Sequence, residues 1–147
     1  MFNCCGILYN HESPRRSESF VTRKITKSIA KILTKQQDFL YLGNIESKRD
    51  WGFAKDYVEA MWLTLQQDNP DDYIIASGQA YSVKDFLTEA FSLVNLDWQK
   101  YVKFDTKLFR PMGDSPLFVG DASKAHKKLN WKPKTSFKEL VKIMLVG

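Results

Sequence analysis

Polar and basic side chains that could bind an anion are spread over several segments of this 147-residue sequence. The run 10–16 combines an amide, an imidazole and guanidinium groups, and single cations stand apart further along the chain. A guanidinium group donates two parallel hydrogen bonds in a planar fork, which suits a phosphate. Convergence on one diphosphate is one hypothesis; separate solvated groups, with Arg49 paired to Asp50, are the alternative. The candidates are Asn10, His11, Arg16, Lys24, Arg49 and Arg110.

The sequence motifs do not contain a complete active site. The seven glycines are not spaced as GxGxxG or as a P-loop, so no glycine-rich loop cradles a phosphate. No Tyr is followed four positions later by Lys, and no GxSxG occurs. Cys4 and Cys5 are adjacent rather than spaced as CxxC, which disfavours a zinc site. We therefore expect neither catalytic residues nor a metal site in this chain.

Composition and charge narrow the function classes. The net charge of +5 is uneven, because basic residues predominate in 1–50 and 98–147 and acidic residues in 51–97. This pattern suits a phosphorylated small molecule, nucleic acid or solvated helix faces, and we expect no nucleic-acid partner. No apolar run is long enough to span a bilayer, and no signal peptide is recognisable. We expect a cytoplasmic protein with two reduced thiols and no membrane segment.

Hydrophobic periodicity predicts the elements that would position the candidate residues. Helical spacing of apolar residues predicts helices over 20–35, 54–67, 82–94, 121–129 and 137–144. Strands are expected at 2–10, 39–42, 73–76 and 101–104, so that the order is mixed α/β. The expected helix caps are Ser17 or Ser19, Ser82 with Asp85, Asp121, and Ser136 with Glu139.

The first strand is expected to position the polar run. Residues 2–10 are almost continuously apolar, as is typical of a strand buried on both faces of a parallel sheet. The run 10–16 would then be a loop at the carboxyl end of that strand, where open α/β sheets bind ligands. The remaining sequence offers few parallel partners for such a strand. We therefore expect the chain to be the later part of a larger fold.

The helix expected at 54–67 has the clearest periodicity in the sequence. The segment 48–52 before it, which carries Arg49, is expected to be a loop. Apolar residues at helical spacing predict one face that packs into the core. They are Ala54, Tyr57, Val58, Met61, Trp62 and Leu65.

Several blocks of this sequence resemble the GDP-mannose 4,6-dehydratases, in the extended short-chain dehydrogenase/reductase group. The resemblance runs in order over nearly the whole chain, and the blocks NHESPRR and RDWG with KDYVEAMW are the most specific. The blocks are GILYNHESPRR at 6–16, FVTRKITKSIAKI at 20–32, LGN at 42–44, KRDWGFAKDYVEAMW at 48–62, IIASGQAYSVKDF at 74–86, FRP at 109–111 and GDASKAHKKLNWKP at 120–133.

The resemblance implies an α/β fold in two parts. Residues 1–19 would form the last strand of a Rossmann-type parallel sheet and its loop, and residues 20–147 mainly the smaller C-terminal substrate-binding lobe. In the family, an N-terminal Rossmann domain binds NADP and the smaller lobe binds the GDP-sugar. An internal redox cycle with loss of water converts GDP-mannose to GDP-4-dehydro-6-deoxy-D-mannose, which leads to GDP-fucose and related deoxysugars.

The resemblance also assigns roles to residues. His11 and Arg16 match positions that contact NADP, and Asn10, Lys24, Arg49 and Arg110 match positions around the nucleotide-sugar. The catalytic Thr, Glu and Tyr of the family, with the Lys of its YxxxK motif, all lie upstream of the matched region. Two departures occur: Ser17 stands where the family usually has Gly, and Asp114 would have to replace a Glu that follows the Arg-Pro pair.

These observations lead to one main hypothesis and one alternative. The chain resembles a truncated or split GDP-mannose 4,6-dehydratase, a lyase that would be inactive without a complementing N-terminal half. The expected partners are GDP-mannose and either that half or further copies of the chain. The alternative is a non-catalytic GDP-sugar-binding module that acts with a partner chain.

Overall fold

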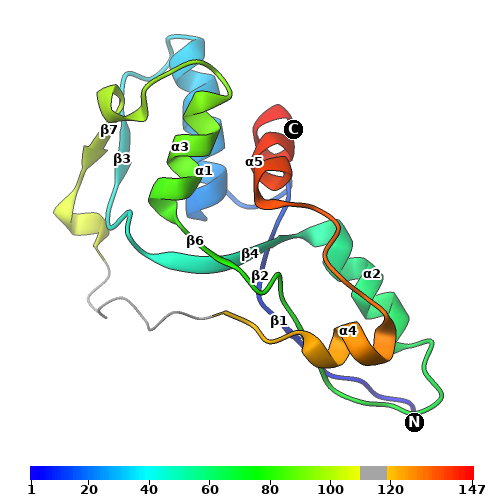
Figure 1. Cartoon of the computed structure of the whole chain (residues 1–147). Coiled ribbons are helices and arrows are strands. Elements are labelled where there is room, and N and C mark those ends of the chain that lie inside the picture. Colours follow the sequence, from blue (N-terminus) through cyan, green and yellow to red (C-terminus); the bar gives the residue numbers. More distant parts are fainter. Residues whose placement is uncertain (110–118) are drawn as a thin grey trace.

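The structure, a computed structural model, describes residues 1–109 and 119–147 (Figure 1). Short strands alternate with helices along the chain. The helices are α1 (Val21–Leu33), α2 (Ala54–Thr64), α3 (Val83–Ser92), α4 (Ser123–Leu129) and α5 (Phe137–Val146), with short 3₁₀ turns at Trp98–Lys100 and Thr106–Leu108. The strands are β1 (Gly6–Leu8), β2 (Asn10–Glu12), β3 (Leu40–Leu42), β4 (Lys48–Phe53), β5 (Tyr73–Ile75), β6 (Ala80–Ser82) and β7 (Val102–Phe104).

The described strands form three small sheets that are mainly parallel. β1 pairs with β5, β2 with β4, and β3 with β7, and each of these pairs is parallel. β6 adds an antiparallel strand to the other edge of β4. Parallel strands connected through helices define an α/β fold, as expected from the sequence.

Two hydrophobic clusters stabilise the molecule. The larger cluster is built on α1, α3 and α5, which lie close together above β4 in Figure 1, and it includes Ile25, Trp51, Phe86 and Val141. The second cluster surrounds the β1–β5 pair and takes residues from α2 and α4, with Trp131 among its largest buried side chains. Segments far apart in the sequence therefore share each cluster.

The first strand differs from the sequence prediction in length and in burial. β1 covers only Gly6–Leu8, and a separate strand, β2, begins at Asn10 in the segment expected to be a loop. Ile7 is 53% exposed, so the prediction of a strand buried on both faces is wrong for the chain as it stands. The physical reason is that β1 has a neighbour on one edge only among the described residues.

Two predictions around α2 are also wrong. The segment expected to be a loop before this helix is β4, a strand paired on both edges. Of the predicted core stripe, Tyr57 is buried, but the next four members are exposed. Those exposed residues are Val58, Met61, Trp62 and Leu65.

Both predicted capping boxes are confirmed. The hydroxyl of Ser82 accepts a hydrogen bond from the backbone N–H of Asp85 at 3.0 Å, and the Asp85 carboxylate accepts from the N–H of Ser82 at 2.7 Å. Ser136 and Glu139 make the same reciprocal contacts at the start of α5. Each box satisfies two backbone donors that a helix start leaves without intrahelical partners.

The other two predicted caps are not formed as expected. α1 begins after Phe20, which offers no side-chain cap, while the Ser17 and Ser19 hydroxyls lie 2.9 Å from each other. Asp121 accepts a hydrogen bond from the N–H of Ser123 at 2.9 Å, but the N-cap of α4 is the residue between them.

Candidate functional site

The pairing of β2 with β4 brings three of the predicted site residues onto neighbouring strands. Asn10 lies opposite Trp51 and His11 opposite Gly52, while Arg49 stands two residues before Trp51 on β4. Asn10 is exposed and Arg49 is half-buried, with its Nη1 donating to the carbonyl oxygen of the preceding residue at 2.6 Å. Since successive side chains of a strand point to opposite faces, Asn10 and Arg49 share one face of the sheet and the imidazole of His11 lies on the other.

Asp50 fixes β4 beside this region. Its side chain is 2% exposed, and one carboxylate oxygen accepts hydrogen bonds from the N–H and the hydroxyl of Ser77. The other oxygen accepts from the N–H groups of Gly78 at 3.0 Å and Gly120 at 3.2 Å. Both carboxylate oxygens therefore have backbone or hydroxyl donors as partners. The carboxylate does not form the ion pair with Arg49 that the sequence left open. They tie the strand that carries Arg49 to the turn after β5.

The turn that binds Asp50 depends on one glycine. Gly78 has a φ of +77°, a backbone conformation that side chains other than hydrogen rarely allow. In this conformation the consecutive N–H groups of Ser77 and Gly78 both point at the Asp50 carboxylate. The turn therefore acts as a small anion-binding nest for a side chain of the same molecule.

His11 is held by one ring nitrogen and leaves the other for a ligand. Its Nδ1 lies 2.9 Å from the carbonyl oxygen of Tyr9, and since a carbonyl only accepts, Nδ1 donates the proton. The imidazole packs against the ring of Tyr57, with 5.3 Å between centroids. Gly52, the strand partner of His11, makes room for this ring, because a Cβ there would lie 2.2 Å from a Tyr57 ring carbon.

Tyr57 supports His11 as a neutral packing group. The side chain is fully buried, and its hydroxyl has no hydrogen-bond partner among the described residues. Burial raises the pKa of this phenol well above its ordinary value, and the negative charges of Asp50 and Asp56 raise it further. The ring of Trp131 also packs against Tyr57, edge-on and with 6.0 Å between centroids. A phenol held neutral in this way orients its neighbours and does not act as a base.

Arg16 is engaged with a buried carboxylate. Glu12 is 1% exposed, accepts a hydrogen bond from the hydroxyl of Thr22 at 2.6 Å, and lies 3.3 Å from Nε of Arg16. The guanidinium carbon of Arg16 lies 3.5 Å from the centroid of the Phe20 ring. Its terminal nitrogens donate no hydrogen bond to any residue in the described part of the chain. Arg16 therefore neutralises Glu12 and keeps donor groups for an external anion.

Lys24 lies in a different part of the surface. Its ammonium group donates to the carbonyl oxygen of Tyr41 at 2.7 Å and lines a cleft of about 480 Å³ between α1 and β3. Lys27 and Lys31 line the same cleft. Within residues 1–109 and 119–147, no direct contact joins Lys24 or Arg16 to Arg49.

Arg110, Asp114 and the Pro that follows Arg110 lie outside the described residues. Among the residues that are described, no three His, Cys, Asp or Glu side chains gather where they could hold a metal ion. Cys4 and Cys5 are both free thiols, and Cys5 is exposed although it lies in the segment 2–10 that was expected to be a buried strand. No helix in the described part of the chain is long and apolar enough to cross a membrane.

Comparison with known proteins places the chain in a family. The family model described as GDP-mannose 4,6 dehydratase matches residues 1–144. The chain belongs to the GDP-mannose 4,6-dehydratase family. It is 54% identical over 145 residues to GDP-mannose 4,6 dehydratase 1 of Arabidopsis thaliana and 45% identical over 162 residues to the human enzyme of that name. Each match covers 99% of this chain but only 40% and 43% of the relative, so the chain spans less than half of their length.

Solved structures support the fold of this family member. The RMD protein of Pseudomonas aeruginosa, solved with NADPH, superposes with a TM-score of 0.85 at 21% identity. The dTDP-glucose 4,6-dehydratase of Bacillus anthracis, solved with NAD, gives 0.79 at 15% identity. Both matches cover 96% of this chain, and they cover 46% and 42% of those chains. At these identities the comparison establishes that the chain shares the α/β fold of the matched part of these proteins.

Proposed function

We propose that this chain supplies the nucleotide-sugar-binding part of a GDP-mannose 4,6-dehydratase, a lyase that converts GDP-mannose to GDP-4-dehydro-6-deoxy-D-mannose and water. The observation that carries the proposal is the β2–β4 register, which sets Asn10 and His11 beside the strand of Arg49. Membership of the family gives this arrangement its substrate. Residues 1–19 would contribute a strand and loop of the nucleotide-binding sheet, and residues 20–147 mainly the substrate lobe.

The chemistry of the ligand suits the groups present. A nucleoside diphosphate sugar carries two adjacent phosphates, whose oxygens accept hydrogen bonds from guanidinium, ammonium and amide groups. Arg49 would bind the diphosphate from a strand that Asp50 fixes in place, and Asn10 would donate from the neighbouring strand. The resemblance adds Lys24 and Arg110 to the proposed set, although Lys24 lies apart from Arg49 at the cleft between α1 and β3 and Arg110 is assigned from its sequence position alone.

The residues present fit part of a nicotinamide dinucleotide site. Arg16 offers free guanidinium donors, which suit the phosphate groups of NADP, and His11 offers Nε2 as an acceptor for a hydroxyl or amide donor of the cofactor. When bound, the nicotinamide ring would accept and return a hydride. Within this chain, His11 and Arg16 would only hold the cofactor, because the sequence carries no glycine-rich loop and no YxxxK motif.

Turnover would therefore require a complementing N-terminal half, and we propose that the pair works in the cytoplasm. The missing motifs also favour a second candidate, a module that binds the GDP-sugar without converting it. The two candidates share one binding site. They differ in whether GDP-mannose is consumed once the complementing half is present.

Ligand-dependent melting tests the binding site directly. A ligand at about 100 times its Kd that binds only the folded state adds about 2.7 kcal/mol of stability. We expect GDP-mannose to raise the melting temperature of the chain, and UDP-glucose to raise it far less. Arg49→Ala should abolish most of the shift, whereas Lys48→Ala, which alters an exposed side chain on the same strand, should keep it. Equal shifts with both nucleotide-sugars, or none with GDP-mannose, would contradict the proposal.

A further inference from the structure

We propose that Glu12 and Phe20 are positioning residues that hold the guanidinium group of Arg16 and present its terminal nitrogens to a phosphate group of a nicotinamide dinucleotide. The inference rests on the proposed function, because Arg16 is one of the two residues proposed to hold that cofactor. It goes beyond that function by naming the contacts that orient Arg16. Its supports are the burial of Glu12, the two contacts of the guanidinium group, and a neighbouring arginine whose donors are all engaged.

Glu12 is a buried carboxylate with one cation beside it. It is the last residue of β2, it is 1% exposed, and it accepts a hydrogen bond of 2.6 Å from the equally buried Thr22 hydroxyl. A buried charge is strongly destabilising unless an opposite charge neutralises it. Nε of Arg16 lies 3.3 Å from the same carboxylate oxygen, and this is the one ion pair that Glu12 forms within residues 1–109 and 119–147. The fold therefore holds Arg16 at this place before any ligand binds.

Two contacts set the orientation of the Arg16 guanidinium group. Nε is buried beside the Glu12 carboxylate, and the guanidinium carbon lies 3.5 Å from the centroid of the Phe20 ring. The group is thus held at one edge by a charge and across one face by an aromatic ring, which attracts a cation. Glu12 ends a strand and Phe20 directly precedes α1, so both contacts come from segments that the fold already fixes.

The terminal nitrogens of Arg16 remain available to a ligand. The Arg16 side chain is 23% exposed, and Nε is its only buried nitrogen without an aligned hydrogen bond. The two terminal nitrogens carry four N–H groups in one plane, which match two oxygens of a phosphate. Because the group is already oriented, it loses less side-chain freedom when an anion binds.

Arg23 shows the contrasting case of an arginine whose terminal nitrogens are engaged within the fold. It is 7% exposed, and its terminal nitrogens donate to the carbonyl oxygens of Met144 at 3.1 Å and Gly147 at 3.4 Å. These carbonyls lie at the end of α5, where a helix leaves acceptors without intrahelical partners. Arg23 is therefore structural, whereas Arg16 keeps its terminal donors for an external anion.

The two contacts differ in their electrostatic effect on a bound phosphate. The negative charge of Glu12 offsets that of Arg16, so the charge by itself weakens the attraction for an anion. Phe20 carries no charge and acts only through the orientation of the guanidinium group. A guanidinium group that must be ordered on binding lowers the affinity by about three- to tenfold. Loss of either contact should therefore weaken binding, whereas a role of Glu12 as counter-charge alone predicts tighter binding without it.

Binding of NADP to this chain can be followed at Arg16 itself, through its Nε–H signal in proton–nitrogen NMR spectra. We expect the signal, identified by its loss in Arg16→Lys, to shift saturably with NADP. Glu12→Leu and Phe20→Leu should each bind NADP about three- to tenfold more weakly than wild type. Glu18→Leu, which removes an exposed negative charge, and Phe104→Leu, which removes an exposed ring, are the matched controls and should bind like wild type.

The result is decisive even if Glu12→Leu lowers the melting temperature, because Phe20 is 44% exposed and Phe20→Leu leaves the buried pair in place. An Arg16 signal that NADP does not shift would overturn the proposal. Wild-type affinity in both variants, or tighter binding by Glu12→Leu with unchanged binding by Phe20→Leu, would overturn it as well.

Two further ligands complete the experiment. NAD keeps the pyrophosphate of NADP but lacks its 2′-phosphate. With the variant effects as expected, equal affinities for NAD and NADP would assign Arg16 to the pyrophosphate, and weaker binding of NAD would assign it to the 2′-phosphate. Failure of GDP-mannose to raise the melting temperature, beside intact NADP binding at Arg16, would count against the proposed function alone.

Discussion

At the scale of single residues, the candidate site is organised by a carboxylate that binds no ligand. Asp50 accepts hydrogen bonds from Ser77, Gly78 and Gly120, and so joins segments 27 to 70 positions apart in the sequence. Arg49 and His11 lie on strands that the Asp50 carboxylate and the Tyr57 ring hold in place. The groups proposed to bind the diphosphate therefore depend on neighbours that have no part in binding.

Asp50→Asn is expected to destabilise the fold. An amide carries no charge and has one acceptor oxygen, so two of the four donors now bound to the carboxylate would lose their acceptor. A hydrogen bond to a charged group contributes about 1.5–3 kcal/mol, and we expect the free energy of unfolding to fall by about 2–3 kcal/mol. Urea denaturation measures this change. Asp38→Asn is the control, because Asp38 is exposed and has no polar partner in the described chain; equal losses would contradict the role of Asp50.

At the scale of elements, local patterns predicted some features and failed for others. α1, α3 and α5, with the capping boxes of the last two, follow from apolar spacing and from Ser paired with an acidic residue three positions later. β4 and β6 were missed because their residues are largely polar and do not alternate, so only their pairing defines them. The α2 stripe was assigned to the core because helical spacing does not distinguish a core face from a face that awaits a partner.

The same limit applies to the candidate site. The anion-binding side chains could be named from residue type and from the resemblance, and three of them do lie on paired strands. The roles of Asp50, Gly52 and Tyr57 could not be predicted, because they come from contacts across the fold. No spacing within the sequence encodes a Tyr57 ring lying over the strand partner of His11.

Gly52→Ala tests the packing of α2 against β4. The added Cβ would lie 2.2 Å from the Tyr57 ring, which is buried and cannot move aside freely. Overpacking of this kind costs about 1–3 kcal/mol. We expect a lower urea midpoint for Gly52→Ala and a nearly unchanged one for Gly6→Ala, whose Cβ has room. A wild-type midpoint for Gly52→Ala would show that Tyr57 is not held where the structure places it.

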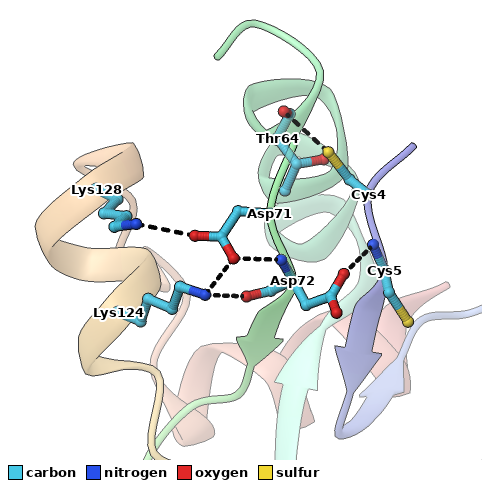
Figure 2. Close-up of polar contacts among 7 residues, drawn as sticks. All are labelled: Cys4, Cys5, Thr64, Asp71, Asp72, Lys124 and Lys128. Atoms are coloured by element: carbon cyan, nitrogen blue, oxygen red, sulfur yellow. Dashed lines mark hydrogen bonds and ion pairs between the residues drawn. The ribbon is translucent and has the colours of Figure 1, made fainter. Parts of the chain in front are cut away.

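The contact between α4 and the segment before β5 should make the folded state less stable at low pH. Asp71 lies 2.6 Å from the ammonium group of Lys124 and 2.9 Å from that of Lys128 (Figure 2). Hydrogen bonds from these two lysines hold the pKa of the Asp71 carboxyl well below its ordinary value. Because the pKa of Asp71 is lower in the folded state than in the unfolded state, the ion pairs stabilise the fold fully above the unfolded pKa of about 3.9. This stabilisation is lost progressively as the pH falls below that value.

Urea midpoints of the wild-type chain and of Asp71→Asn, measured from pH 7 to pH 2, test this loss of stability in acid. We expect wild type to be the more stable at neutral pH and the two curves to converge under acid. Because the pair is solvent-accessible, the difference should also shrink at high salt. A difference that persists unchanged at pH 2 would assign the effect to packing rather than to charge.

At the scale of the whole molecule, the chain has a well-packed lobe and an open boundary. The larger cluster joins α1, α3 and α5 into a core, whereas the smaller one surrounds a strand with a single neighbour. The sequence led us to expect a strand that needs neighbours on both edges, and the structure supplies one of them. The exposed face of α2 and the open edge of β1 belong to this incomplete side.

The most direct test of the account is reconstitution of the dehydratase reaction. This chain and the unmatched part of the Arabidopsis relative are purified separately and together, and GDP-mannose is supplied with NADP. We expect GDP-4-dehydro-6-deoxy-D-mannose only when both polypeptides are present, with kcat/KM lowered at least tenfold by Arg49→Ala and unchanged by Lys48→Ala. An assembled complex that leaves GDP-mannose unconverted, or turnover without this chain, would contradict the claim that the chain supplies the substrate-binding part of the enzyme.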